Sequence, residues 1–150
     1  MTKQVKLVNI CPVFVSEDVR RTAEYYVNVL GFRYASHFDK ADQFAALYRD
    51  SVEIVVVQKQ KDKVESNRKR YGNGFDAYID PDTLEGVDDL FHELQQKQVK
   101  ILTEPRITDY GSYEFVFEDI DGRVIGVGLI ANKDMFFADS NILEKNEQQQ

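Results

Sequence analysis

The sequence predicts an α+β protein built from two tandem βαβββ modules. The first observation is a repeat, because each half of the 150-residue chain gives a strand, a helix and three further strands in the same order. The second is a pair of stretches with apolar side chains at helical spacing. The third is Asp121-Gly122 between two apolar runs, which is typical of a tight hairpin. We expect a first module at 1–58, a linker at 59–73, a second module at 74–130 and a partly disordered C-terminal extension at 131–150.

In the first half, residues 6–15 (KLVNICPVFV) are apolar on both faces, which is typical of a strand buried on two sides. Ser16 is the expected N-cap of the following helix, with negative charge in its first turn. Val19, Ala23, Tyr26 and Leu30 form its apolar face, and Gly31 is expected to end it. Strands are expected at 32–38, 43–49 and 51–58, with turns at 40–42 and 50–51.

The second half repeats this order after residues 59–73, which are polar and locally basic. We interpret 59–73 as a solvated linker, and the alternative is a basic loop that steers an anionic ligand. A strand at 74–80 then precedes a helix capped by Asp82 or Thr83, whose apolar stripe is Val87, Leu90, Phe91 and Leu94. The remaining strands are expected at 99–104, 113–119 and 123–130.

Charge and composition exclude several classes of protein. The net charge of −7 argues against nucleic-acid binding, which requires a basic surface. The single cysteine, Cys11, allows no intrachain disulfide. No apolar run approaches the roughly 20 residues that cross a bilayer, and the N-terminus lacks the apolar core of a secretion signal. We therefore expect a cytoplasmic protein with no nucleic-acid or membrane partner.

Two groups of motifs resemble a known family. Residues 12–19 (PVFVSEDV), 23–26 (AEYY) and 29–32 (VLGF) resemble the opening of vicinal oxygen chelate proteins, which include glyoxalase, bleomycin-resistance proteins and extradiol dioxygenases. Residues 110–115 (YGSYEF) and 118–122 (EDIDG) are similar to the WG-x-x-EF…DPDG pattern of the bleomycin-resistance branch. The resemblance implies two βαβββ modules whose curled mixed sheets form a concave cleft, often in a homodimer.

Metal-dependent members of that superfamily hold a divalent ion with His and Glu side chains from four strand positions. Carried onto this sequence, these positions fall on Cys11, on Val55 or the nearby Glu53, on Asp76 or the neighbouring Phe75, and on Gly126. The set contains no histidine, and Gly126 offers no ligand. A cysteine with one or two carboxylates suits none of the usual ions well. We therefore expect no metal and no cofactor.

The two histidines and the cysteine have other interpretations. His37 is expected late in a strand as a rim residue, with a catalytic or metal role as the alternative, and His92 on a helix surface. A lone buried Cys11 is most often a small core residue, and a nucleophilic role would need a nearby base or cation.

Without a metal, binding of a small aromatic or cationic molecule is the leading function, and no catalytic residue is assigned. Tyr110 takes the position of the family's groove tryptophan, while Arg106 and Glu114 flank it. The alternative is that most of these aromatic rings pack in the protein core. The candidate ligand-binding residues are Cys11, Phe44, Tyr48, Glu53, Asp76, Tyr110 and Tyr113.

Two other functions stay open. The first is a lyase, isomerase or dioxygenase that uses an atypical metal site, or a metal-free enzyme with Asp76 or Glu53 as base. The second is a scaffold or regulatory domain whose C-terminal tail engages a partner. The absence of histidine at the four ligand positions favours binding over both.

Overall fold

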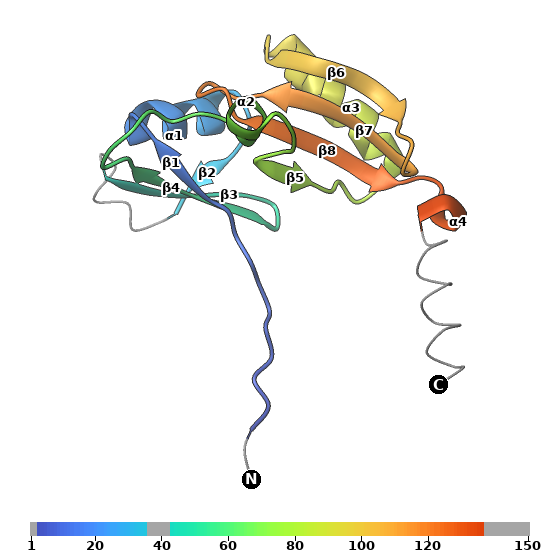
Figure 1. Cartoon of the computed structure of the whole chain (residues 1–150), viewed down its shortest axis with the longest axis horizontal. Coiled ribbons are helices and arrows are strands. Elements are labelled where there is room, and N and C mark those ends of the chain that lie inside the picture. Colours follow the sequence, from blue (N-terminus) through green and yellow to red (C-terminus); the bar gives the residue numbers. More distant parts are fainter. Residues whose placement is uncertain (1–2, 36–42, 137–150) are drawn as a thin grey trace. The chain divides into compact units, whose positions relative to one another are not determined.

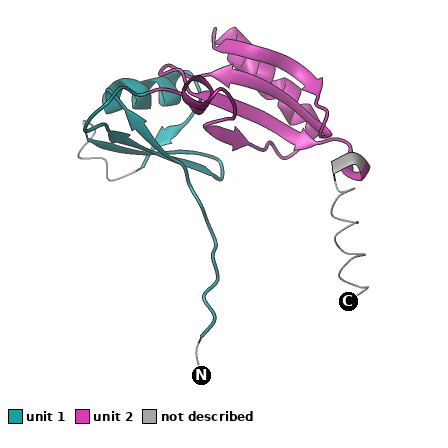
Figure 2. Cartoon of the chain, in the orientation of Figure 1, with its two compact units in different colours: residues 1–64 teal, residues 65–150 magenta. Residues whose placement is uncertain are grey.

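The computed structural model describes residues 3–35 and 43–136. The chain divides into two compact units, residues 1–64 and 65–150 (Figure 2). The boundary falls inside the stretch 59–73. In the part of the chain that is described, no helix has the length and apolar character needed to cross a membrane.

The first unit is a four-stranded mixed sheet with one helix on one face (Figure 1). Sheet A has the order β1-β4-β3-β2, in which β1 pairs with β4 in parallel and the other neighbours are antiparallel. Helix α1 buries Val19, Ala23 and Tyr26 on the sheet side, where the ring of Tyr26 contacts Phe14 and Phe32. The elements are β1 (Val13–Ser16), α1 (Val19–Asn28), β2 (Arg33–Tyr34), β3 (Phe44–Arg49) and β4 (Val52–Gln58).

The second unit repeats this arrangement. Sheet B has the order β5-β8-β7-β6, again with one parallel pair, β5 and β8. Helix α3 buries Val87, Phe91 and Leu94, and the ring of Phe91 contacts Phe115 of β7. The elements are α2 (Asn67–Tyr71), β5 (Ala77–Ile79), α3 (Leu84–Gln96), β6 (Lys100–Ile107), β7 (Ser112–Glu118), β8 (Val124–Ile130) and α4 (Lys133–Phe136). The predicted α+β class with two βαβββ modules is confirmed.

The prediction of a buried strand at 6–15 is wrong over most of that range. Only Val13–Ser16 form β1, because the parallel register with β4 starts at Val13 opposite Val55. The Val55 N–H donates to the Pro12 carbonyl at 3.1 Å, and the segment before it pairs with no strand in the described chain. Its aliphatic side chains are almost fully exposed, from 85% for Val5 to 95% for Leu7. The segment is apolar, as the sequence shows, but its side chains are buried only if another strand or another chain packs against them.

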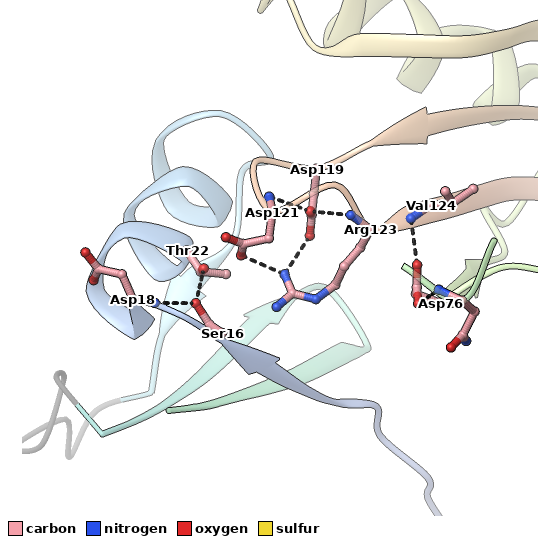
Figure 3. Close-up of polar contacts among 9 residues, drawn as sticks. Ser16, Asp18, Thr22, Asp76, Asp119, Asp121, Arg123 and Val124 are labelled. Atoms are coloured by element: carbon pink, nitrogen blue, oxygen red, sulfur yellow. Dashed lines mark hydrogen bonds and ion pairs between the residues drawn. The ribbon is translucent and has the colours of Figure 1, made fainter. Parts of the chain in front are cut away.

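The prediction that Ser16 caps the first helix is also wrong. Asp18 is the N-cap, and its Oδ1 accepts a hydrogen bond from the Arg21 N–H at 3.1 Å. The Ser16 hydroxyl instead accepts the Asp18 N–H at 3.0 Å and shares a 2.7 Å hydrogen bond with Thr22 (Figure 3). Ser16 therefore holds the end of β1 against the first turn of α1. In the second unit, Thr83, one of the two residues predicted as the cap, is the N-cap of α3.

The stretch 59–73 contains a short helix that the linker interpretation did not include. The Ser66 hydroxyl accepts the Lys69 N–H at 3.0 Å at the start of α2, and Gly72 ends α2 with a φ of 82°. The expected turn at 40–42 and His37 lie outside the described residues. Asp50 does form a turn, with a φ of 52°.

Candidate functional site

Each sheet has one face covered by its helix and one face turned away from it, which we call the helix-free face. Because side chains alternate along a strand, the register fixes which residues share this face. On sheet A it is mainly aliphatic. Its members on β1, β3 and β4 are Val13, Val15, Phe44, Ala46, Tyr48, Glu53, Val55 and Val57.

The polar corner of this face holds three of the predicted site residues. Tyr48 and Glu53 are register partners, and the Tyr48 hydroxyl donates to Glu53 Oε1 at 2.8 Å. The Asn9 amide donates to Glu53 Oε2 at 3.2 Å. The hydrogen bond to Glu53 raises the pKa of Tyr48, with smaller contributions from desolvation and from the charges of Glu53 and Cys11. Both oxygens of Glu53 are thus occupied, and Cys11 lies nearby as a half-buried free thiol.

The helix-free face of sheet B has a different composition. Two glycines of β8, Gly126 and Gly128, lie beneath the ring of Tyr78 from β5. A Cβ at Gly126 would lie 2.6 Å from Tyr78 Cδ2, and a Cβ at Gly128 would lie 2.6 Å from Glu114 Cβ. Both positions therefore require glycine so that Tyr78 can cover the strand.

Glu114 of β7 lies at the centre of this face. It is 3% exposed, and the Tyr110 hydroxyl donates to its Oε1. The Tyr78 hydroxyl pairs with the Ser112 hydroxyl at 2.7 Å, and Ser112 donates onward to the Leu129 carbonyl at 3.3 Å. Either hydroxyl of the Tyr78–Ser112 pair can be the donor. Within the described chain, Glu114 Oε2 has no hydrogen-bond partner.

Both tyrosines of this cluster are held in their neutral form. Burial, then the hydrogen bond to Glu114, raises the pKa of Tyr110 to about 12. Burial likewise raises the pKa of Tyr78, the Ser112 hydrogen bond opposes the rise, and a hydrogen bond to Glu114 and the charge of that carboxylate add to it. At neutral pH the two phenols are therefore hydrogen-bond donors.

Asp76, a predicted ligand-binding residue, has a structural position. Its Oδ1 accepts the Asn67 N–H at 3.0 Å, and its Oδ2 accepts the Val124 N–H at 2.8 Å (Figure 3). Asp76 thus ties the first turn of α2 to the start of β8. A carboxylate engaged by two backbone amides is not placed to act as a base.

The β7–β8 turn holds an ion-pair network of two aspartates and Arg123. Arg123 donates to Asp119 Oδ2 at 2.9 Å and to Asp121 Oδ2 at 2.8 Å, and the Asp119 carboxylate also accepts the Arg123 N–H at 3.0 Å (Figure 3). Gly122 has a φ of 85° between them. The hairpin predicted at Asp121-Gly122 is confirmed, and this ion-pair network holds it.

Tyr113 lies on the opposite face from the cluster. Its hydroxyl donates to Asp88 of α3 at 2.6 Å, and this hydrogen bond raises its pKa. Tyr113 therefore belongs to the packing of α3 on sheet B, and we leave it out of the candidate site. Phe44 does lie on the helix-free face of sheet A, where it is exposed.

The ligand positions carried over from the metal-dependent relatives do not fit a metal ion. Gly126 has no side chain, and the Tyr78 ring occupies the space a ligand there would need. Both Asp76 oxygens already accept backbone amides. Among the described residues, no group of three His, Cys, Asp or Glu side chains is arranged to hold an ion. We therefore derive no chemistry through a metal.

Tyr78 and Ser112 are the site residues that the sequence analysis did not identify. Tyr78 was placed in a strand, but its position above two glycines depends on the β5–β8 register. The signal was present in part, because the alternate glycines in IGVG (125–128) leave room on one face of a strand.

The comparisons with known proteins agree with this architecture. Residues 8–127 match the family model of the glyoxalase/bleomycin resistance protein/dioxygenase superfamily. This match covers most of the chain, and the chain belongs to that superfamily. No curated protein matches the chain at a significant level.

Three solved structures show the same fold at low sequence identity. A bleomycin-binding protein from Streptomyces verticillus, complexed with copper(II)-bleomycin, is 20% identical over 83% of this chain and 97% of its own, with a TM-score of 0.61. A glyoxalase/bleomycin resistance protein/dioxygenase from Nocardioides is 12% identical over 87% and 88%, also with a TM-score of 0.61. A fosfomycin resistance protein, FosX, from Listeria monocytogenes, complexed with manganese(II) and a dihydroxypropylphosphonic acid, is 10% identical over 90% and 99%, with a TM-score of 0.60.

Proposed function

We propose that this chain is a glyoxalase/bleomycin-resistance-like protein that binds a small aromatic or cationic molecule in the cytoplasm, without a metal or cofactor. The observation that carries the proposal is the cluster on the helix-free face of sheet B. There, a buried carboxylate, Glu114, lies next to two partly exposed tyrosine rings, Tyr78 and Tyr110.

The chemistry of this cluster favours a planar or positively charged ligand. A cation over a tyrosine ring gains about 0.5–2 kcal/mol, more as the site is desolvated. The net charge of −7 attracts cations and repels anions. The likeness to the Streptomyces bleomycin-binding protein supports a binding role, because that protein is complexed with copper(II)-bleomycin.

Sheet A offers a second surface to the same class of ligand. Phe44 and Tyr48 are exposed on its helix-free face, and Tyr48 lies beside Glu53 and Cys11. Because Glu53 already accepts two hydrogen bonds, this surface gives aromatic and aliphatic contact more than a charged anchor. We propose that the surface of sheet A binds a ligand by contact area, and that the cluster of sheet B, taken by itself, binds by polar recognition.

The test is a binding screen with metal-free protein, monitored by ligand-observed NMR and by thermal shift. The panel contains aromatic compounds in cationic, neutral and anionic forms, with bleomycin as a larger probe. We expect saturable binding in the order cationic, neutral, anionic, reduced by Tyr110→Ala and unchanged by Tyr71→Ala, which alters an exposed tyrosine of α2. Absence of saturable binding, or preference for anions, contradicts the proposal.

The alternative is a metal-dependent enzyme, for which the manganese-bound FosX structure is the precedent. Metal analysis of protein purified without added metal or a metal-binding tag tests it. Near-stoichiometric metal that is lost in Cys11→Ala or Asp76→Ala would favour the enzyme and contradict the metal-free proposal.

We also propose that the chain forms a homodimer. The support is the segment before β1, where Val5, Leu7, Val8 and Ile10 are each at least 85% exposed. This segment runs away from β1 in an extended path (Figure 1), and burial of four aliphatic side chains against a second copy would be strongly favourable. Light scattering should give a dimer mass for the full chain and a lower mass for Leu7→Asp combined with Ile10→Asp. The control is Lys3→Asp with Lys6→Asp, and a monomeric wild type contradicts the proposal.

A further inference from the structure

Glu114 is a buried carboxylate that is only half satisfied. The side chain is 3% exposed, Tyr110 donates to its Oε1, and its Oε2 is buried with no hydrogen-bond partner in the described chain. Buried carboxylates in folded proteins are normally paired, because an unpaired oxygen loses its hydration with nothing in return. An oxygen kept in this state points to a partner from outside the chain.

The neighbouring groups do not satisfy Oε2. Tyr110 already gives its proton to Oε1, and the Tyr78 hydroxyl pairs with Ser112 and forms no hydrogen bond with Oε2. Arg106 lies opposite Glu114 in the β6–β7 register, but it is exposed and forms no ion pair with Glu114 in the described chain.

The surroundings define the chemistry of the missing partner. Tyr78 and Tyr110 are 39% and 44% exposed, so their rings form the border between Glu114 and solvent. Their raised pKa values keep both phenols neutral, which leaves Glu114 as the charge of the cluster. The complement is therefore a positive group with an N–H bond, attached to a body that contacts aromatic rings.

We infer, on the basis of the binding function proposed above, that Glu114 Oε2 anchors the protonated amine of the ligand by accepting an N–H hydrogen bond between Tyr78 and Tyr110. The ligand class is an aromatic or other apolar amine that is cationic at neutral pH. A quaternary ammonium lacks the N–H and leaves Oε2 unpaired. A neutral aromatic compound leaves the carboxylate without a counter-charge.

Binding must also move a tyrosine ring. Oε2 itself is buried, so a ligand reaches it only when the ring of Tyr78 or Tyr110 swings outward. The exposure of both rings leaves space for this movement. The chain contains no tryptophan, so tyrosine fluorescence reports such a change directly.

The test compares three probes that differ in one group: benzylamine, benzyltrimethylammonium and benzyl alcohol. Affinities are measured by ligand-observed NMR and tyrosine fluorescence on the wild type, Glu114→Gln and Glu118→Gln. Glu118→Gln is the matched control, because it removes the same charge from the same strand at a residue that pairs with Lys100. We expect benzylamine to bind at least tenfold more tightly than the other two, and Glu114→Gln to abolish that preference while Glu118→Gln keeps it.

The possible results separate this inference from the proposed function. Binding of all three probes with equal affinity, or benzylamine binding unchanged in Glu114→Gln, would overturn the anchor and leave the binding function intact. No binding of any aromatic cation, bleomycin included, would overturn both.

Thermal unfolding without ligand adds a second criterion that needs no probe. It is measured in the Tyr110→Phe background, because this change removes the hydrogen bond to Oε1. An unpartnered Oε2 predicts that adding Glu114→Met to Tyr110→Phe leaves the unfolding temperature unchanged or raises it. A marked fall in this background, or an equal fall for Arg106→Gln, would show that Oε2 is paired within the protein and overturn the inference.

Discussion

The two sheets have equivalent strand orders, but the side chains on their helix-free faces differ in kind. On β4 of sheet A the residues that point to this face are Glu53, Val55 and Val57, so each position carries its own covering side chain. On β8 of sheet B the equivalent face has Gly126 and Gly128, and one ring, Tyr78, covers both. The two modules therefore cover their sheets by different means.

The difference changes what each face can do. Branched aliphatic side chains make the face of sheet A apolar, and its one carboxylate, Glu53, has two partners near solvent. The glycines of sheet B lower the surface of β8, so that Glu114 and Ser112 lie beneath aromatic rings. A duplicated scaffold thus gives one face for contact and one with a buried charge.

The largest expected effect follows from adding a side chain to the bare strand. Gly128→Val would place a Cβ 2.8 Å from the Tyr113 carbonyl and 2.6 Å from Glu114 Cβ, and neither can move without shifting β7. We expect a loss of about 3 kcal/mol in the free energy of unfolding, at the upper end for overpacked cores. Urea denaturation measures it. The control is Val57→Ala in sheet A, expected to lose about 1 kcal/mol.

An effect of Gly128→Val no larger than that of Val57→Ala would show that the two faces are equally tolerant, and the comparison would fail.

The second expected effect concerns the start of the same strand. Asp76→Asn replaces one of two acceptor oxygens with an amide group that cannot accept the N–H of Asn67 or Val124. Hydrogen bonds to charged groups contribute about 1.5–3 kcal/mol, so we expect a loss of about 2 kcal/mol in the free energy of unfolding. Chemical denaturation measures it, with Asp82→Asn as an exposed control. Equal stability of the two variants would return Asp76 to the list of functional candidates.

Local signals in the sequence were sufficient for most of the fold. The Asp121-Gly122 turn and a cap at Asp82 or Thr83 each depend on neighbouring residues, and both were predicted correctly, with Thr83 as the cap. Of the predicted helical stripe, Val87, Phe91 and Leu94 are buried, and Leu90 is half-buried. The N-terminal strand was not, because whether residues 5–10 pair depends on how far β4 extends beside them. A strand needs a partner, and the partner is remote in the sequence.

The candidate site was harder to predict from the sequence for the same reason. Tyr110, Tyr48 and Glu53 could be proposed from the motif and from strand periodicity, and the structure places each of them on a helix-free face or beside it. Asp76 instead accepts two backbone N–H groups, and Tyr113 donates to Asp88 of α3. Tyr78 could not be selected, since its role depends on a ring crossing from β5 over β8.

The third prediction uses the raised pKa of Tyr110. Because the folded state holds this proton more tightly than the unfolded chain, the associated stability is present in full below pH 10 and is lost as the pH rises from 10 to about 12. Tyr110 is partly exposed, so solvent screening reduces the contribution to roughly 1 kcal/mol. Denaturation between pH 9 and 12 should show a steeper loss for the wild type than for Tyr110→Phe. If stability falls with pH equally in the wild type and in Tyr110→Phe, the Tyr110 hydroxyl is solvated in the folded state and the prediction is wrong.

The smallest expected effect belongs to sheet A. Glu53→Gln keeps an oxygen that can accept the Tyr48 hydroxyl, and the pair lies near solvent, so we expect a change within about 0.5 kcal/mol in the free energy of unfolding. Glu114→Gln in sheet B changes a buried carboxylate and should differ clearly from it in either direction. Measured together, the two substitutions compare the same chemical change on the two faces. Equal effects would mean that the burial of Glu114 does not set sheet B apart, and the polar recognition proposed for it would lose its basis.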